Sequence, residues 1–297
     1  MSSPFEFNVA ELIVIKMSEG FAVPEKPLVV IEASRSWSLI DWADIFAHRD
    51  LLYFLTWRDL KVRYKQTVLG VAWALLQPIF MTLIFTLLFG RLAGLGSQIS
   101  VPYPLFALAG LVPWTFFATA VTTSGNSVVS NTNLITKVYF PRILIPIASV
   151  AAAFVDFAMS FIVLLLVMFY YQVGLKPSIL MILPLIMLTF LFALGVGMYF
   201  AALNVKYRDI RFVVPFLIQL WLFVSGVIVP MSVLSQKWRW AVSLNPMAGI
   251  IEGYRAALFG QPFNWTSLGV AAALTCAVLV YSAYSFRRME KNFADII

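Results

Sequence analysis

The sequence predicts an all-α integral membrane protein. Six transmembrane helices are expected, preceded by an amphipathic interfacial helix, with a re-entrant helical segment between the fifth and sixth spans. Of the 297 residues, 61% are hydrophobic and only 12% are charged, about half the charged share of a soluble domain. The mean hydropathy is +0.89. Long uncharged windows recur along the chain, and a helix needs about 20 apolar residues to cross the hydrocarbon layer.

The composition also excludes whole classes of function. So few charges cannot cover a soluble globule of this size, which excludes a soluble enzyme and a free nucleic-acid binder. The chain has 1 Cys (Cys276) and 1 His (His48), which excludes a disulfide framework, a Cys/His zinc site and a Cys–His catalytic pair. We therefore expect no catalytic residue, no bound metal and no nucleic-acid partner.

The N-terminal part of the chain precedes the first span. Residues 1–35 mix short β-like runs with Pro and Glu and lack the pattern of a signal peptide. We interpret them as a cytoplasmic extension, to which the residues assign no role. Residues 36–67 are expected to form cytoplasmic or interfacial amphipathic helices.

Residues 51–65 are too charged to cross a membrane but have the pattern of an interfacial helix. One narrow stripe of the helical wheel carries Tyr53, Trp57, Leu60 and Tyr64. Asp59 and Arg63, four residues apart, are expected to pair. Such a helix can be a plain anchor on anionic lipid. Alternatively, it guides a phosphorylated lipid headgroup, because Arg donates two hydrogen bonds to phosphate together. The gate residues in that hypothesis are Arg58, Lys61, Arg63, Tyr64 and Lys65.

The uncharged windows define the transmembrane domain, residues 68–286. Residues 94–98 and 124–133 are too polar to be buried in lipid, so the second span is expected to end near residue 123. The expected spans are 68–90, 104–123, 143–171, 178–203, 212–231 and 265–286.

Residues 246–259 form an apolar stretch of 14 residues, too short for a full crossing. Asn245 is a suitable N-cap and Gly260 a suitable end. We interpret the stretch as re-entrant, with a seventh crossing as the alternative. Glu252 and Arg255 lie one turn apart on it, and a local ion pair is favoured over an outer gate in which Arg255 meets substrate charge.

The distribution of basic residues sets the expected orientation. With both termini in the cytoplasm, 16 of the 21 Lys and Arg residues lie on the inner side and 5 on the outer side. This asymmetry satisfies the positive-inside rule. Residues 287–297 are then a cytoplasmic tail.

Asp156 is the only acid within an expected full span. A carboxylate inside the membrane costs at least ~2.5 kcal/mol, which makes it a functional suspect. It can face a pore, contact Ser or Thr on a neighbouring helix, or be protonated. A structural hydrogen bond within the bundle is an equal alternative.

Four segments together resemble a known family. They are residues 57–70 (WRDLKVRYKQTVLG) with Trp73 and Gln77-Pro78, residues 133–142 (NLITKVYFPR), residues 203–210 (LNVKYRDI), and residues 244–247 with 252–255. This order is similar to the membrane subunits of ABC-type polysaccharide exporters for O-antigen, capsule and teichoic-acid chains. The resemblance covers roughly residues 38–297.

The resemblance implies a pore made of two copies of the chain, with two separate ATPase subunits on the cytoplasmic face. The expected substrate is a lipid-linked polysaccharide, most simply O-antigen on polyprenyl pyrophosphate, moved to the outer face of a bacterial inner membrane. The chain contains no G-x-x-x-x-G-K-[ST] phosphate loop, so ATP and Mg²⁺ are expected on the partner. The alternative is an ABC exporter of another amphipathic substrate, such as a drug, haem or a lipid.

Two other classes of function compete with an exporter. An intramembrane glycosyltransferase needs clustered carboxylates, and the spans hold no Asp/Glu pair at metal-binding spacing. A passive channel is disfavoured by the resemblance of residues 133–142 to a coupling segment.

By resemblance, residues 133–140 form the coupling helix that fits a groove of the ATPase. Asn133 can cap it and Pro141 ends it. Leu134, Ile135 and Val138 would form an apolar face able to transmit a rigid-body push. The alternative is a loop resting on lipid. The residues assigned to coupling are Asn133, Leu134, Ile135, Lys137, Val138, Tyr139, Phe140 and Arg142.

Aromatic rings are the last candidates. The chain has 9 Trp, 11 Tyr and 26 Phe, and most Phe side chains must face lipid or other helices. Rings in a pore can stack on sugars and allow sliding through many weak contacts. The candidate pore aromatics are Trp73, Phe80, Tyr103, Trp114, Phe117 and Tyr199.

Overall fold

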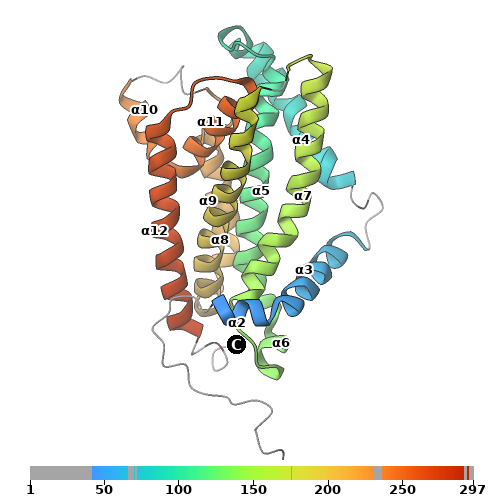
Figure 1. The fold of residues 1–297 in the computed structure, drawn as a ribbon, viewed down its shortest axis with the longest axis vertical. Helices are drawn as coiled ribbons and strands as arrows, with labels where there is room; N and C mark the ends of the chain where they lie inside the picture. Colours follow the sequence, from blue (N-terminus) through green and yellow to red (C-terminus); the bar gives the residue numbers. More distant parts are fainter. Residues whose placement is uncertain are drawn as a thin grey trace, which may run out of the picture. The chain divides into compact units, whose positions relative to one another are not determined.

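The computed structural model describes residues 42–65, 70, 72–174, 176–230, 236–290 and 293, without the side chains of residues 42–44 and 236–238. The predicted extension 1–35 and most of the predicted tail lie outside these residues. Every regular element within the described ranges is a helix (Figure 1). The prediction of an all-α protein is therefore confirmed.

Residues 42–170 contain the short helices α2 and α3 and the first three long apolar helices. Their bounds are α2 (Trp42–Ala47), α3 (Arg49–Tyr64), α4 (Ala72–Phe85), the π-helical η1 (Thr86–Leu92), η2 (Leu95–Gln98), α5 (Tyr103–Ser130), α6 (Thr132–Lys137) and α7 (Leu144–Tyr170). The second half contains η3 (Pro177–Met181), α8 (Ile182–Lys206), α9 (Ile210–Phe223), α10 (Gln236–Ser243), α11 (Pro246–Phe259) and α12 (Trp265–Glu290).

Five described helices are long and apolar enough to cross a membrane, namely α4 with η1, α5, α7, η3 with α8, and α12. The expected fifth span, residues 212–231, corresponds to α9, which has only 14 residues. At 1.5 Å per residue α9 is about 21 Å long, less than the ~30 Å hydrocarbon layer. The chain then continues through turns to Pro230. The six-span count therefore stays a prediction.

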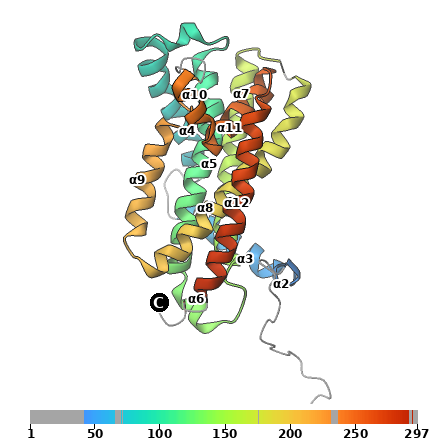
Figure 2. The same cartoon turned by 90° about the vertical axis from the view of Figure 1, so that its left-hand side faces the viewer.

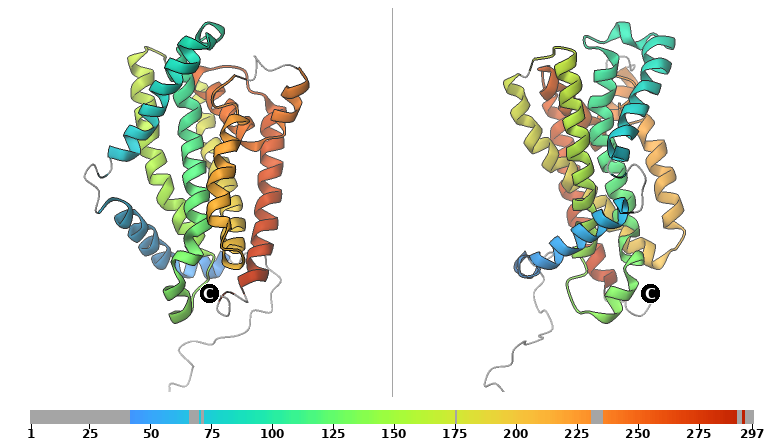
Figure 3. Two further views of the ribbon diagram at one scale, coloured as in Figure 1. Left: turned by 180° about the vertical axis from the view of Figure 1, so that it is seen from behind. Right: turned by 90° about the vertical axis from the view of Figure 1, so that its right-hand side faces the viewer.

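Helix α5 is the centre of the bundle. In its most apolar window 78% of residues are buried, against 17% for the helix at residues 72–92. It packs against α4, α7, α8, α9 and α11. Viewed from behind, α5 runs between α4 on one side and α9 on the other (Figure 3, left). The faces of α4 and α9 that point away from the bundle are apolar and exposed.

Helix α5 extends beyond the expected second span, whose limit in the membrane stays a prediction. Its second half continues to Ser130, although residues 124–133 are polar enough that the span was expected to end near residue 123. The reason is that short polar side chains return their hydrogen bonds to their own helix. Asn126 Nδ2 donates to Thr122 O at 3.0 Å, and Ser127 Oγ donates to Ser124 O at 2.7 Å. The polarity is satisfied internally, so the helix does not end.

Close packing of α8 depends on two glycines. A Cβ at Gly197 would lie 2.7 Å from Ser124 on α5. A Cβ at Gly195 would lie 3.1 Å from Val278 on α12. The two residues are on opposite sides of α8, and they let both neighbouring helices approach its backbone closely.

The helix expected at residues 246–259 forms with those bounds as α11. Asn245 accepts a hydrogen bond from Met247 N at 3.1 Å, and Gly260 adopts a left-handed conformation with φ 66°. Both end signals are thus confirmed. Nearly every α11 side chain is buried. Whether α11 enters the membrane without crossing it stays a prediction.

The helix ends divide into two groups. Helices α3 and α6 lie near one end of the bundle, where α12 also ends (Figures 1 and 2). Helices α10 and α11 lie near the other end. This division places the basic α3 and the expected coupling segment at the same end.

Candidate functional site

A cavity of about 230 Å³ opens where α3, α4, α5 and α7 meet. Helix α3 contributes its C-terminal turn and α4 its N-terminal half. The lining mixes one ion pair, one indole, one amide and several hydroxyl groups. The residues that define its polar and aromatic character are Arg63, Tyr64, Trp73, Gln77, Thr115, Thr119, Thr123, Asp156 and Ser160.

Asp156 binds the end of the interfacial helix. Arg63 Nη1 forms an ion pair with its carboxylate, and the hydroxyl of Tyr64 donates to the same carboxylate. Burial, followed by the hydrogen bond to Asp156, raises the pKa of Tyr64 to about 12. Tyr64 therefore remains a neutral donor at physiological pH. The expected pairing of Arg63 with Asp59 is wrong, because Arg63 reaches α7 instead.

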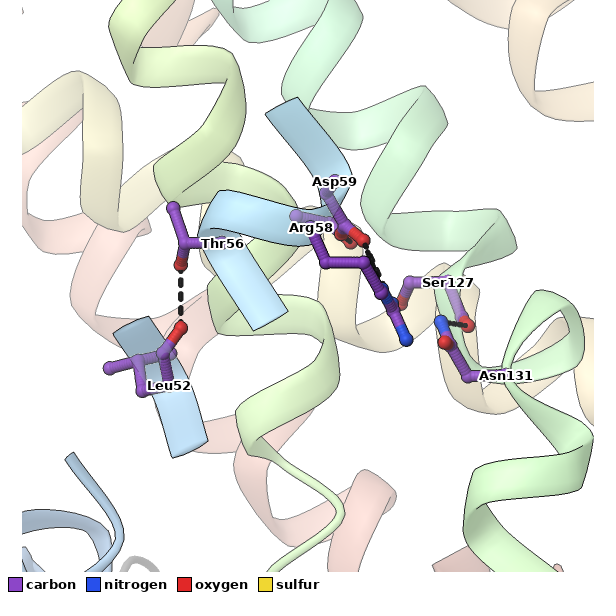
Figure 4. A network of polar contacts seen from close by, with 7 residues as sticks. Leu52, Thr56, Arg58, Asp59, Ser127 and Asn131 are labelled. Atoms are coloured by element: carbon purple, nitrogen blue, oxygen red, sulfur yellow. Dashed lines mark hydrogen bonds and ion pairs between the residues drawn. The ribbon is translucent and has the colours of Figure 1, made fainter. Parts of the chain in front are cut away.

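Asp59 makes a second connection between α3 and α7. Ser149 Oγ donates to Asp59 Oδ2 at 3.3 Å, and Arg58 Nη2 donates to Asp59 Oδ1 at 2.8 Å. Figure 4 shows the Arg58 side chain running from α3 toward Ser127 of α5 and Asn131, the residue between α5 and α6. Arg63 and Asp59 thus connect α3 to α7, while Arg58 bonds to Asp59 on its own helix.

The exposed side of α3 is aromatic and basic. Tyr53, Trp57 and Lys61 are exposed, and Lys65 extends the same basic flank. Lys61 Nζ lies 5.4 Å from the centroid of the Trp57 ring. Among the five predicted gate residues, Lys61 and Lys65 face outward, while Arg63 and Tyr64 line the cavity.

Pro78 explains one polar contact in the cavity wall. Proline lacks an N–H, so the carbonyl of Ala74, four residues earlier, loses its helical donor. Ser160 Oγ of α7 donates to Ala74 O at 3.0 Å and replaces that donor. This exchange ties α4 to α7 beside Trp73, and satisfies backbone at membrane depth as a lipid environment requires.

The predicted pore aromatics separate into two groups. Trp73 and Phe80 on α4 are both 52% exposed, and Trp73 lines the cavity. Tyr199 is half-buried and packs on Tyr281 with ring centroids 5.6 Å apart. These three remain candidates for contact with a substrate.

Tyr103, Trp114 and Phe117 are buried in the core of the chain, which contradicts their assignment to a pore surface. Phe117 stacks on Phe192 at 5.2 Å. The Tyr103 hydroxyl donates to Ile228 O at 3.0 Å. Their residue types fitted a pore equally well, but α5 is the central helix and its aromatic face fills the bundle.

Arg255 is buried on α11, and no ion pair joins it to Glu252 in the part of the chain that the structure describes. The favoured local pair is therefore wrong. Arg255 instead donates to Gly226 O at 2.7 Å, Val227 O at 2.8 Å and Phe106 O at 3.3 Å. Its guanidinium lies 3.5 Å from the Phe106 ring centroid.

These contacts give Arg255 a structural role. Beyond the short α9 the backbone turns, and its carbonyls need donors if they lie at membrane depth. Arg255 supplies them and joins α11, α5 and the end of α9. It has no exposed face for substrate charge in this conformation, which removes the predicted outer-gate role for Arg255. One oxygen of Glu252 is buried without a hydrogen-bond partner among the described residues.

The expected coupling helix is shorter than predicted. Helix α6 ends at Lys137, and Val138 begins an extended segment. Asn133 is exposed and does not cap the helix, because Asn131 occupies the N-cap position. The helix stops before residue 140 because Val138 has an extended backbone, with φ −130° and ψ 135°, and Phe140 beyond it is buried in the core at this end of the bundle.

The side chains of this loop face two ways. Ile135 and Phe140 are 5% exposed and pack into the core at this end of the bundle. Arg142 Nη1 donates to Glu290 O at 2.6 Å, which fixes the loop to α12. Val138 and Tyr139 are 51% and 85% exposed. Leu134 is half-buried, and Asn133 and Lys137 are exposed. The exposed apolar surface is therefore Val138 with Tyr139.

The polar lining that α5 contributes to the cavity was not among the predicted site residues. Thr115, Thr119 and Thr123 recur every four residues, and all three line it. That spacing is a readable helical signal. It was overlooked because threonine in an apolar helix ordinarily needs no explanation.

The apolar helices of membrane-spanning length define a multi-pass membrane protein, in which the basic and aromatic helix α3 contributes to a polar cavity between the long helices. The sequence profile of the ABC-2 type transporter family matches residues 50–259, and the chain belongs to this family. The family resemblance read from the motifs is thereby confirmed.

Individual relatives cover most of the chain. It is 29% identical over 252 residues to the O-antigen export system permease protein RfbA of Klebsiella pneumoniae, across 84% of this chain and 95% of the relative. The RfbA protein of Myxococcus xanthus is 28% identical over 258 residues, across 86% and 98%. The polysialic acid transport protein KpsM of Escherichia coli is 24% identical over 241 residues, across 79% and 91%.

Proposed function

We propose that this chain is the permease of an ATP-driven exporter that moves a lipid-linked polysaccharide, most simply O-antigen on polyprenyl pyrophosphate. Transport runs from the cytoplasm to the outer face of a bacterial inner membrane. The observation that carries the proposal is the similarity to O-antigen export permeases over nearly their whole length. The relative from Escherichia coli is named for the transport of polysialic acid, which is also a polysaccharide.

The proposed motor is a separate pair of ATPase subunits that hold ATP and Mg²⁺. The chain's lack of a phosphate-loop motif supports this division. The α6 end of the bundle, which carries the proposed docking surface Val138 with Tyr139, would then face the cytoplasm together with both termini. The basic residues of α3 lie near the same end, which agrees with the positive-inside rule.

The proposed pore consists of two copies of the chain. A passage between copies would be bounded by the least buried long helix, α4, and by the short α9, with α5 between them (Figure 3, left). Exposed Lys61 and Lys65 would attract the diphosphate headgroup to the membrane surface. The cavity at Arg63 and Asp156 lies next to the proposed point of entry.

The test is reconstitution of the chain with its ATPase subunit in proteoliposomes carrying a lipid-linked glycan. We expect ATP-dependent appearance of the glycan on the membrane face opposite to the ATPase, and native mass spectrometry of a complex with two copies of each subunit. A matched control is a hydrolysis-deficient ATPase subunit in the same vesicles. Nucleotide hydrolysis by this chain alone, or glycan movement without the ATPase, would contradict the proposal.

A further inference from the structure

Between Leu105 and Val128, helix α5 exposes almost only polar side chains. Between Leu105 and Val128 nearly every residue is buried, and the partly exposed ones are Thr115, Ala118, Thr119, Thr122, Thr123 and Asn126. Five of these six carry a hydroxyl or an amide. We call these five residues the α5 polar row.

The polar row lies on one face of the helix. Its members are spaced by three or four residues, apart from the neighbours Thr122 and Thr123, and such spacing keeps side chains on one side. From residue 115 to residue 126 the row is about 16 Å long. It occupies the half of α5 nearer to α6, and the other half is buried.

The row is not needed to hold helices together. Thr122 Oγ1 donates to Ala118 O at 2.7 Å and Thr123 Oγ1 donates to Thr119 O at 2.8 Å, so these hydroxyl hydrogens are satisfied within α5. Asn126 is the exception, because its Oδ1 accepts from Asn204 Nδ2 of α8 at 3.0 Å. The threonine oxygens keep lone pairs that can accept hydrogen bonds from an outside group.

A lipid-facing role does not explain the row. Valine has the same shape as threonine without the hydroxyl, and the exposed faces of the other long helices are apolar. On α7, for example, Val155, Ile162 and Leu166 are exposed. A face of hydroxyls within the same bundle therefore fits contact with water or with a polar ligand better than contact with lipid tails.

The cavity at Asp156 adds the second observation. Thr115, Thr119 and Thr123 of the row line it together with Trp73 and Gln77. An exposed indole presents a flat apolar surface, while threonine oxygens and the Gln77 amide offer acceptors and donors. A sugar ring has C–H faces and a rim of hydroxyl groups, so it can use both kinds of contact at once.

We propose that the α5 polar row is a binding surface for the sugar units of the transported substrate, which begins in the cavity beside Trp73 and continues along α5. This inference rests on the proposed export function and deepens it. The ligand class is a neutral, polyhydroxylated glycan. The row offers repeated weak hydrogen-bond acceptors instead of one tight site, which suits a polymer that must advance.

The first experiment measures water access. Cys276 is the chain's only cysteine, so Cys276→Ala gives a chain without thiols, and labelling is read on this chain after its separation from the ATPase subunit. Thr119→Cys and Thr122→Cys are introduced singly and treated with a charged, membrane-impermeant methanethiosulfonate in the complex with the ATPase subunit. The matched controls are Val155→Cys, next to Asp156 in sequence, and Ile162→Cys. We expect labelling of the row positions but not of the controls. Equal labelling of row and controls would overturn the proposal.

The second experiment removes the hydroxyls without changing side-chain shape. The variant Thr119→Val/Thr122→Val/Thr123→Val is compared with Thr275→Val, whose hydroxyl is buried elsewhere and also bonds to its own helix. We expect glycan export by the row variant to fall roughly tenfold, since several weak hydrogen bonds are lost together. The control variant should export like the wild type.

The two proposals fail in different ways. If the wild-type complex exports no lipid-linked glycan, the proposed function is wrong, whatever the thiol labelling shows. If the wild type exports and the row variant, at equal membrane abundance, exports at the same rate, the polar row does not bind sugar and this inference is overturned. Export by the wild type with a selective loss in the row variant supports both.

Discussion

Arg63 of the interfacial helix forms an ion pair with Asp156, the acid within α7, across 93 positions of sequence. The pair neutralises a carboxylate that would otherwise be costly inside a membrane. It also fixes the C-terminal turn of α3 to a membrane-spanning helix. Together with the hydrogen bond between Asp59 and Ser149, the pair joins α3 to the wall of the cavity that α4 also lines.

Replacement of Asp156 by Asn should loosen α3. The substitution keeps the shape but removes the charge, and leaves the Arg63 guanidinium partly buried without its counterion. The side chains of Arg63 and Asp156 keep 25% and 19% of their surface exposed. We therefore expect a loss of roughly 1–2 kcal/mol, less than for a fully buried pair. Thermal unfolding of the purified protein in detergent measures it.

The control for this variant is Asp50→Asn on the same helix. Asp50 is fully exposed, and its contact with Arg49 is 3.9 Å long. It should leave the unfolding temperature unchanged. Equal unfolding temperatures for Asp156→Asn and the wild type would show that the ion pair does not hold α3.

The Tyr64 hydroxyl predicts a specific pH dependence. Burial, with the hydrogen bond to Asp156, raises the pKa of Tyr64 from 10.0 to about 12. Above pH 10 the unfolded chain loses this proton while the folded chain keeps it, so stability is lost as the pH rises from about 10 through 12. Below pH 9 this group contributes no pH dependence. Comparing the unfolding temperature of Tyr64→Phe with the wild type from pH 8 to pH 12 isolates the effect, because other tyrosines cancel. Parallel curves would contradict it.

The absence of a side chain at Gly110 leaves room for the Arg255 guanidinium. A Cβ at position 110 would lie 2.6 Å from Arg255 Nη2, so Gly110→Ala must displace the guanidinium from the carbonyls that it binds. We expect destabilisation of roughly 1–3 kcal/mol, as for other overpacked sites. Gly269→Ala on α12 is the control, because nothing lies within 4 Å of its added Cβ. It should be neutral or slightly stabilising, since alanine favours helix. Detergent melting curves that rank these variants in the opposite order would show that Arg255 tolerates the intrusion.

Helix ends could be predicted from the sequence where neighbouring residues determine them. The bounds of α11 follow from Asn245 and Gly260, whose side-chain cap and left-handed backbone are properties of the local chain. The end of α5 was not predictable in the same way. The polarity of residues 124–133 indicated the end of the span in lipid, but it does not end the helix, because side-chain hydrogen bonds return to the same helix and α5 continues to Ser130.

Contacts between distant segments could not be predicted from the sequence. Arg255 lies one turn from Glu252, yet its guanidinium reaches carbonyls at residues 106, 226 and 227. Only the packed arrangement of α5, α9 and α11 brings these groups together. The aromatic residues illustrate the same limit, since Trp73 and Trp114 have one chemistry but opposite burial.

The exposed pair Val138 and Tyr139 gives the sharpest prediction for coupling. We expect Val138→Ser/Tyr139→Ser to fold normally and to lose binding of the ATPase subunit several-fold, because both side chains point into solvent from an anchored loop. Ile135→Ala is the contrasting variant. Ile135 is 5% exposed and packs in the core of this end, so its truncation should cost about 2–4 kcal/mol of stability and act on coupling only through the fold. Co-purification of the ATPase and unfolding temperature, measured on the same preparations, separate the two effects. Normal ATPase binding by the Val138/Tyr139 double variant would contradict this docking surface. The remaining exposed candidates would then be Asn133 and Lys137 of α6.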